Sequence, residues 1–185
     1  VAQRIIRLRI LEKLMLAGVT IVDPDTTVID AGVKIGMDTV IKPFTVIEGD
    51  AHIGKKCVIG PFAHLRPQTR IADQTEIGNF TEISRSRVGS ECFMKHFSFI
   101  GDAVVGDNVN IGAGVVTANF DGKNKHKTTI GNGAFVGSDS ILVAPVKIGK
   151  NALTGAGCVV AKTKTVPDGQ VMVGVPGRII GKKKI

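Results

Sequence analysis

The sequence predicts an all-β protein: a parallel β-helix built from hexapeptide repeats, with a short N-terminal α-helix and one protruding loop at about residues 117–127. Three observations support this fold class. Aliphatic residues recur every six positions over most of the chain, apolar residues near the N-terminus follow helical spacing, and the mostly basic stretch NFDGKNKHK at residues 119–127 interrupts the repeat. The 185 residues are enough for one domain with a substantial core.

The N-terminal segment, residues 1–18, is expected to form a helix. Ile5, Leu8, Leu11 and Met15 follow helical spacing, and Gly18 is a good C-terminal cap. The apolar face of this helix needs cover from the first coils, from a partner chain or from another domain. Because the first residue is Val rather than Met, the segment is also a possible linker from a missing domain.

The hexapeptide repeat is expected to fill residues 19–170. In steps of six from residue 29, all ten positions hold Ile or Leu: Ile29, Ile35, Ile41, Ile47, Ile53, Ile59, Leu65, Ile71, Ile77 and Ile83. After single-residue slips, and again after the loop, the inward positions are Val88, Met94, Ile100, Val105, Ile111, Ile130, Val136, Leu142, Ile148, Thr154 and Val160. Thr154 is the one weak inward position.

This period determines the shape of each turn, which we call a coil. A six-residue period does not fit an α-helix, whereas three hexapeptides complete a triangular coil of about 18 residues. Successive coils pair as parallel strands about 4.8 Å apart, so the aliphatic ladder fills the interior. Residues 29 to about 166 should make between seven and eight coils. The last segment, residues 171–185, is expected to turn at Pro176 and Gly177 and to end in a basic tail.

The composition limits the classes of partner. Lys and Arg outnumber Asp and Glu by 24 to 16, which favours polyanions or phosphorylated small molecules. The absence of Trp and Tyr, with eight scattered Phe, argues against nucleic acid, which usually needs aromatic stacking platforms. Cys57, Cys92 and Cys158 form no CxxC pair and read as buried thiols, and no apolar run reaches the roughly 20 residues that cross a bilayer. We therefore expect a cytoplasmic protein without membrane partners.

Four stretches carry a resemblance to a known family: GNFTEI, NVNIGAG, ANFDGKNKHKTTIG and AFVGSDSILVAPVKIG. From about residue 4 to about residue 160 the chain resembles the C-terminal acetyltransferase domain of the bacterial bifunctional N-acetylglucosamine-1-phosphate uridyltransferase/glucosamine-1-phosphate acetyltransferase. The resemblance implies a left-handed coil and a homotrimer with active sites between subunits. It also implies acetyl transfer from acetyl-CoA to glucosamine 1-phosphate, for UDP-N-acetylglucosamine and cell-wall synthesis. The family's Gly-rich nucleotide loop is absent, so uridylyl transfer is not expected.

The candidate general base is a histidine. Acetyl transfer from a thioester to an amine needs a base that works near neutral pH, which suits histidine, and needs no metal. The residues alone do not choose among His52, His64, His96 and His126. The resemblance does, because KHFSFIGD matches the segment that carries the family's proton acceptor, here His96.

The other candidate site residues also follow from the resemblance. The acceptor-binding residues are Arg66, Ser84, Phe99, Asn110 and Lys125, and the acetyl-CoA-binding residues are Ala113, Asn119, Phe120, Ser138 and Ala156. Ser84 stands where the family has a lysine, Phe99 and Phe120 replace tyrosines, and Gly174 stands where an arginine is expected.

The period itself adds two expectations about the phosphate-binding positions. Arg66 and Ser84 are 18 residues apart, so they should stack on the same face and could grip one anion. Because side chains alternate along a strand, Arg85 is expected to point away from Ser84.

Three alternatives remain open at this point. One is an acetyltransferase of the same fold that acts on another amino sugar. Another is a zinc-dependent carbonic anhydrase, which needs three clustered histidines, although His52 and His64, 12 residues apart, should lie on different faces. The last is a structural or interaction β-helix without enzymatic activity.

Overall fold

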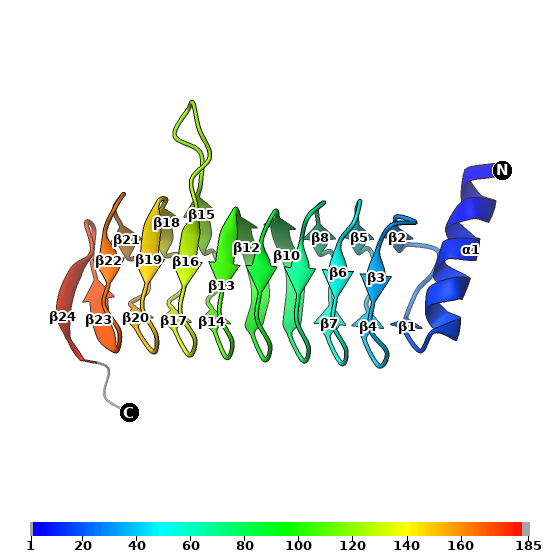
Figure 1. Ribbon diagram of the computed structural model, residues 1–185, viewed down its shortest axis with the longest axis horizontal. Helices are drawn as coiled ribbons and strands as arrows, with labels where there is room; N and C mark the ends of the chain where they lie inside the picture. Colours follow the sequence, from blue (N-terminus) through cyan, green and yellow to red (C-terminus); the bar gives the residue numbers. More distant parts are fainter. Residues whose placement is uncertain (1, 183–185) are drawn as a thin grey trace.

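The computed structural model describes residues 2–182, which form one elongated three-sided coil with a helix at its N-terminal end (Figure 1). Helix α1 spans Ala2–Leu16 and ends as predicted at Gly18, whose φ is 91°. The N–H groups of Gly18 and Val19 donate to the carbonyls of Met15 and Leu14, the Schellman arrangement that closes many helices. Of the predicted tail, residues 183–185 lie outside the described residues.

The coil has three faces, named A, B and C, and its strands are short. Face A contains β1 (Thr20–Ile21), β4 (Val40–Ile41), β7 (Val58–Ile59), β14 (Asn110–Ile111), β17 (Phe135–Val136), β20 (Leu153–Thr154) and β23 (Gln170–Val173). Face B contains β2 (Val28–Ile29), β5 (Val46–Ile47), β8 (His64–Leu65), β15 (Val116–Ala118), β18 (Ile141–Val143) and β21 (Val159–Val160). Face C contains β3 (Lys34–Ile35), β6 (His52–Ile53), β9 (Arg70–Ile71), β11 (Arg87–Val88), β13 (Ala103–Val105), β16 (Thr128–Ile130), β19 (Val146–Ile148) and β22 (Thr165–Val166).

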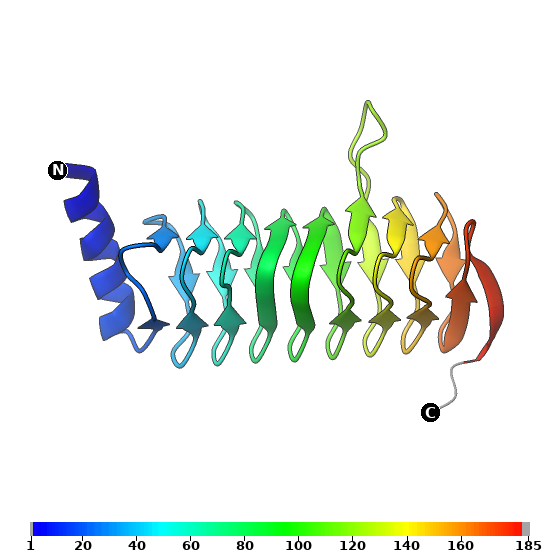
Figure 2. The ribbon, with the colours of Figure 1, turned by 180° about the vertical axis from the view of Figure 1, so that it is seen from behind.

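Two longer strands continue from face A to face B through the corner between them. They are β10 (Glu76–Ser84) and β12 (Phe93–Gly101), visible as long ribbons in the middle of the coil in Figure 2. Neighbouring strands pair in parallel, except that β24 (Arg178–Lys182) pairs antiparallel with β23 at the C-terminal end. Among residues 2–182, face C contains eight strands, so this part of the chain makes about eight coils. The fold is the predicted left-handed parallel β-helix.

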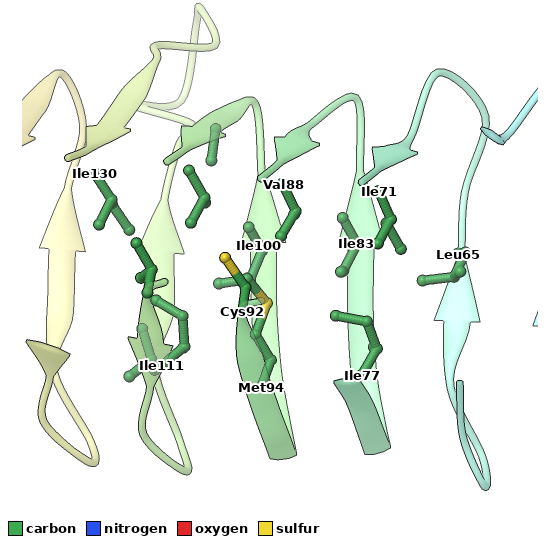
Figure 3. Packing of buried hydrophobic residues seen from close by; sticks show 14 of the residues in the cluster. Leu65, Ile71, Ile77, Ile83, Val88, Cys92, Met94, Ile100, Ile111 and Ile130 are labelled. Atoms are coloured by element: carbon green, nitrogen blue, oxygen red, sulfur yellow. The ribbon is translucent and has the colours of Figure 1, made fainter. Parts of the chain in front are cut away.

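The aliphatic ladder forms the core. Every predicted inward position is buried except Ile35, which is partly buried, and Figure 3 shows Leu65, Ile77 and Ile83 among the side chains that fill the interior. Thr154 is tolerated inside because its hydroxyl accepts a hydrogen bond from the Gly137 N–H at 3.1 Å and lies 3.0 Å from the Ser140 hydroxyl. The three cysteines are buried free thiols, as predicted.

Outward side chains differ between the faces. On faces A and B many are apolar: Val40, Val58, Phe93, Phe135, Leu153, Val28, Val46, Val116, Ile141 and Val159. On the corner between these faces, the rings of Phe44, Phe62 and Phe80 stack with centroid distances of 4.8 and 5.1 Å. Face C instead presents Lys34, Arg70, Arg87 and Lys147. The two apolar faces and the corner between them are therefore suited to contact another protein surface.

The first coil covers only part of helix α1. Leu11 is fully buried and Leu14 packs against the core, whereas Ile5, Leu8 and Leu16 remain exposed. Across residues 2–182, no helix is long and apolar enough to cross a membrane.

Candidate active site

The protruding loop is a small hairpin, which we call the arm, residues 119–127. It leaves the wall after β15 and returns at Thr128, and it projects away from the coil in Figures 1 and 2. Phe120 and Lys125 form an antiparallel bridge, and the His126 N–H donates to the Asn119 carbonyl at 2.7 Å. Thr117 and Ala118, at the start of the predicted loop, still belong to β15. The predicted protruding loop is confirmed, and its two halves pair as a hairpin.

Asp121 organises the tip of the arm. Its Oδ1 accepts from the N–H groups of Lys123 and Asn124, while its Oδ2 contacts His126 Nε2 at 2.6 Å and Lys162 Nζ at 3.2 Å. The Asn124 N–H, and next to it His126, hold the pKa of Asp121 well below its usual range. Because Lys162 comes from the wall, its contact with Asp121 fastens the arm to a later coil.

One group of predicted residues lies on the corner between faces A and B. His96, Ala113, Ser138 and Ala156 each stand two residues after an inward residue of face A, and the inward residues Met94, Ile111, Val136 and Thr154 are successive register partners. The four residues therefore form a column along one corner, which we call the histidine column. His96, Ser138 and Ala156 are exposed. The Ser98 hydroxyl donates to the His96 carbonyl at 2.8 Å, which fixes the backbone beside the candidate base.

A second group lies on the corner between faces B and C. Arg66 is exposed there, and its Nη1 donates to Glu82 Oε1 at 3.1 Å. Ser84 is in register with Arg66, as the 18-residue spacing predicted, because the preceding residues Ile83 and Leu65 are partners. Ser84 is buried, however, and its hydroxyl accepts a hydrogen bond from Arg85 Nη1 at 2.7 Å.

The prediction that Arg85 points away from Ser84 is wrong. Strand β10 ends at Ser84, and Arg85 has a left-handed backbone with φ of 48°, so strand alternation no longer determines where its side chain lies. Its guanidinium turns back over Ser84 and binds Asp102, with Nε and Nη2 at 2.8 and 2.9 Å from the two carboxylate oxygens.

Asp102 connects this corner to the arm. Its carboxylate also accepts from the side-chain amide of Asn119, which is buried at the base of the arm. Arg85 lowers the pKa of Asp102, and Asn119 lowers it further. Asn119 and the ring of Phe99 both press against Gly101, where an added Cβ would lie 2.6 Å from the Asn119 amide nitrogen and 2.7 Å from the ring.

The structure thus divides the predicted residues into groups rather than one cluster. The histidine column lies on one corner, and Arg66, Ser84, Phe99 and Asn119 lie on or beside another. Asn110 is on face A, and Phe120 and Lys125 are on the arm. Sequence reasoning missed Asp102. Its spacing was a usable signal, because Arg85, Asp102 and Asn119 recur every 17 residues, the length of a coil that is one residue shorter than usual.

The histidines do not gather at one place. His52 is on face C and His64 on face B, as their spacing predicted. Within residues 2–182, no group of three or more His, Cys, Asp or Glu side chains is arranged to hold a metal ion.

Comparison with known proteins agrees with this fold. The sequence matches the bacterial transferase hexapeptide family (six repeats) over residues 50–85 and 127–162. The UDP-N-acetylglucosamine acyltransferase of Francisella novicida has a TM-score of 0.63 at 15% identity over 89% of this chain and 71% of that one. The Arabidopsis UDP-N-acetylglucosamine acyltransferase has a TM-score of 0.58 at 16% identity, over 89% and 73% of the two chains. The repeat and the three-sided coil are therefore similar to those of the bacterial transferase hexapeptide family, and the two solved structures share this fold.

The chain is also similar to the bifunctional protein GlmU. Identity is 43% to GlmU of Fervidobacterium nodosum, over 96% of this chain and 46% of the relative. Identity is 42% to GlmU of Thermosipho africanus, over 95% of this chain and 46% of the relative. The chain therefore spans about half the length of the curated relatives that it matches.

Proposed function

We propose that this chain transfers the acetyl group of acetyl-CoA to the amine of glucosamine 1-phosphate, giving N-acetylglucosamine 1-phosphate for UDP-N-acetylglucosamine and cell-wall synthesis. The observation that carries the proposal is the histidine column. An exposed imidazole shares one corner with small residues, Ala113, Ser138 and Ala156, that leave space for a long thioester to lie along the coil. The similarity to GlmU supports the same assignment.

The reaction needs few groups from the protein. The uncharged amine attacks the thioester carbonyl carbon, and His96 accepts the proton that the amine loses. The carbon–sulfur bond then breaks, the sulfur leaves as the thiol of CoA after taking up a proton, and an amide remains. Arg66 and Lys125 are cations available for the sugar phosphate, and Asn110 and Phe99 would contact the sugar.

Homotrimer formation is the second part of the proposal. The histidine column and the Arg66 group lie on different corners, so one chain does not bring the candidate base and the candidate phosphate ligand to one place. The apolar outward side chains of faces A and B provide surfaces that a neighbouring copy could bury, and the exposed Phe120 on the arm could reach that neighbour. Light scattering should give three times the 19.5 kDa chain mass. A stable, active monomer would contradict this arrangement.

The decisive experiment is a thiol-release assay with acetyl-CoA and a panel of amino sugars, with and without phosphate. We expect glucosamine 1-phosphate to give the highest kcat/KM. If none of the amino sugars in the panel causes thiol release, the enzymatic proposal is refuted. A thermal-shift titration with acetyl-CoA then distinguishes an acetyl-CoA-binding protein from a purely structural coil, because only a protein that binds the donor gains stability as the donor concentration rises.

One observation favours the second candidate, an acetyltransferase of the same fold with a different amino-sugar acceptor. Ser84 is buried and its hydroxyl oxygen already accepts a hydrogen bond from Arg85, so its side chain offers a phosphate no charge and no exposed hydroxyl. Higher kcat/KM with another amino sugar in the same panel would select this candidate.

A further inference from the structure

A continuous set of polar contacts runs along the corner between faces B and C. Arg85 donates to Ser84 and grips both carboxylate oxygens of Asp102, and Asp102 accepts from the side chain of Asn119. Arg85, Asp102 and Asn119 come from three consecutive coils. We call these three residues the arginine column.

Asp102 contacts both ends of the arm. Its carboxylate holds Asn119, where the arm begins, and its main-chain carbonyl accepts from the Thr128 N–H at 3.2 Å, where the arm returns to the wall. Its own N–H donates to the Ser84 carbonyl at 3.0 Å. Asp102 therefore contacts the chain both where the arm leaves the coil and where it rejoins it.

Arg85 determines how the Asp102 carboxylate is turned. The guanidinium binds side-on with two nearly equal distances, 2.8 and 2.9 Å, which is the paired geometry that only arginine supplies. The Asp102 side chain is 16% exposed and that of Arg85 is 32% exposed, so water screens the pair only partly. Without the guanidinium, the carboxylate is free to rotate toward water, and Asn119 loses a fixed acceptor.

We propose that Arg85 is a positioning residue for the reaction: acting through Asp102, it fixes Asn119 and the base of the arm without touching either substrate. The inference rests on the proposed function for its kinetic consequence, because the arm carries Phe120 and Lys125. Its structural consequence is independent of that function. Loss of the guanidinium should loosen the arm while the aliphatic ladder, which Arg85 does not enter, stays intact.

The experiment uses the full chain and measures hydrogen–deuterium exchange of the peptide that covers residues 119–128, together with kcat and KM for acetyl-CoA. Arg85→Met should speed exchange of the arm about tenfold and lower kcat/KM for acetyl-CoA about tenfold, while the peptide over β18 and β19 exchanges as in the wild type. Arg85→Lys should retain only part of the wild-type protection and activity, because an ammonium keeps the charge but cannot form two parallel hydrogen bonds to the carboxylate. Arg87→Met, which removes an exposed arginine on face C, is the matched control and should change neither measurement.

Asp102→Asn changes the second residue of the arginine column. It therefore tests the proposal independently, and it still does so if Arg85→Met does not fold. Arg85→Met and Asp102→Asn together should loosen the arm no more than either change alone, because both break one chain of contacts. Wild-type exchange of the arm in both single variants overturns the proposal, and so does an equal effect of Arg87→Met or full rescue by Arg85→Lys. If the wild type shows no acetyltransferase activity, the proposed function fails, and the exchange measurement still decides the role of Arg85.

Discussion

Replacing Gly101 with Ala is the sharpest test of the site at the base of the arm. The new methyl group would lie 2.6 Å from the Asn119 amide nitrogen and 2.7 and 2.8 Å from two carbons of the Phe99 ring. Carbon atoms normally approach non-bonded neighbours to about 3.5–4.0 Å. Gly101 does not have a positive φ, so its backbone accepts Ala without strain. The clash must therefore be relieved by the two side chains, which have to move by roughly 1 Å.

The two expected effects, on the rate and on the stability, are measured separately. A displacement of about 1 Å at a positioned group can cost about 10²-fold in rate. Overpacking costs about 1–3 kcal/mol, and we expect the lower end because the methyl meets the ends of two side chains rather than backbone. At this chain length, about 1 kcal/mol lowers the melting temperature by about 2–4 °C. Gly101→Ala should therefore be a folded protein with about 1% of the wild-type kcat/KM.

Thiol release and thermal melting on the same preparation measure both effects. Gly169→Ala is the control, because its backbone φ of 66° makes Ala strained while no atom lies within 4 Å of the added methyl. This control should lose a similar amount of stability and keep its activity. Wild-type kcat/KM in Gly101→Ala would refute the assignment of Phe99 and Asn119 to the site.

The remaining predictions concern the base, the arm and acid. His96→Ala should lower kcat about 10²- to 10⁴-fold, the usual contribution of a general base, and leave the KM for acetyl-CoA unchanged. His52→Ala, on face C, is the control and should retain activity. Near-normal turnover of His96→Ala would remove His96 from the mechanism. Deleting residues 120–126 should abolish thiol release with little change in melting temperature, because the arm contributes nothing to the ladder, and retained activity would contradict the role of the arm. Because the folded state lowers the pKa of Asp102, its contribution to the arm is present above the ordinary carboxyl pKa of about 3.9 and is lost as the pH falls through the lower folded value. Hydrogen exchange of the arm, corrected for its intrinsic pH dependence, should therefore increase below about pH 4 in the wild type and much less in Asp102→Asn; equal profiles would show that Asp102 does not hold the arm.

The interior of the coil could be predicted from the sequence because one physical requirement repeats in every turn. Each inward position must fill the same narrow interior, so Ile and Leu recur at a fixed spacing and reveal the coil directly. The partial exposure of Ile35 was not visible in that spacing. It lies in the first coil, where no earlier strand of face C covers it, and the period alone does not distinguish an end coil from a central one.

The candidate site was predictable only in part, because its residues lie on corners. Corner residues are not held to one spacing or one residue type, so the resemblance to a family, rather than the period, singled out His96 and Asn119. The prediction for Arg85 failed for a related reason: alternation holds within a strand, and Arg85 is the first residue beyond β10. A left-handed corner residue can return its side chain over the residue before it.

The arginine column lies where the coils are shortened by one residue. Between inward residues, the corner of faces B and C has five residues from Leu65 to Ile71 but four from Ile83 to Val88 and four from Ile100 to Val105. The ladder stays in register across each short corner, and the corner residues of consecutive coils are in contact, first Arg85 with Asp102 and then Asp102 with Asn119. The two single-residue slips lie in the coils that precede the arm, and the arginine column connects these coils to a segment that contributes nothing to the aliphatic ladder.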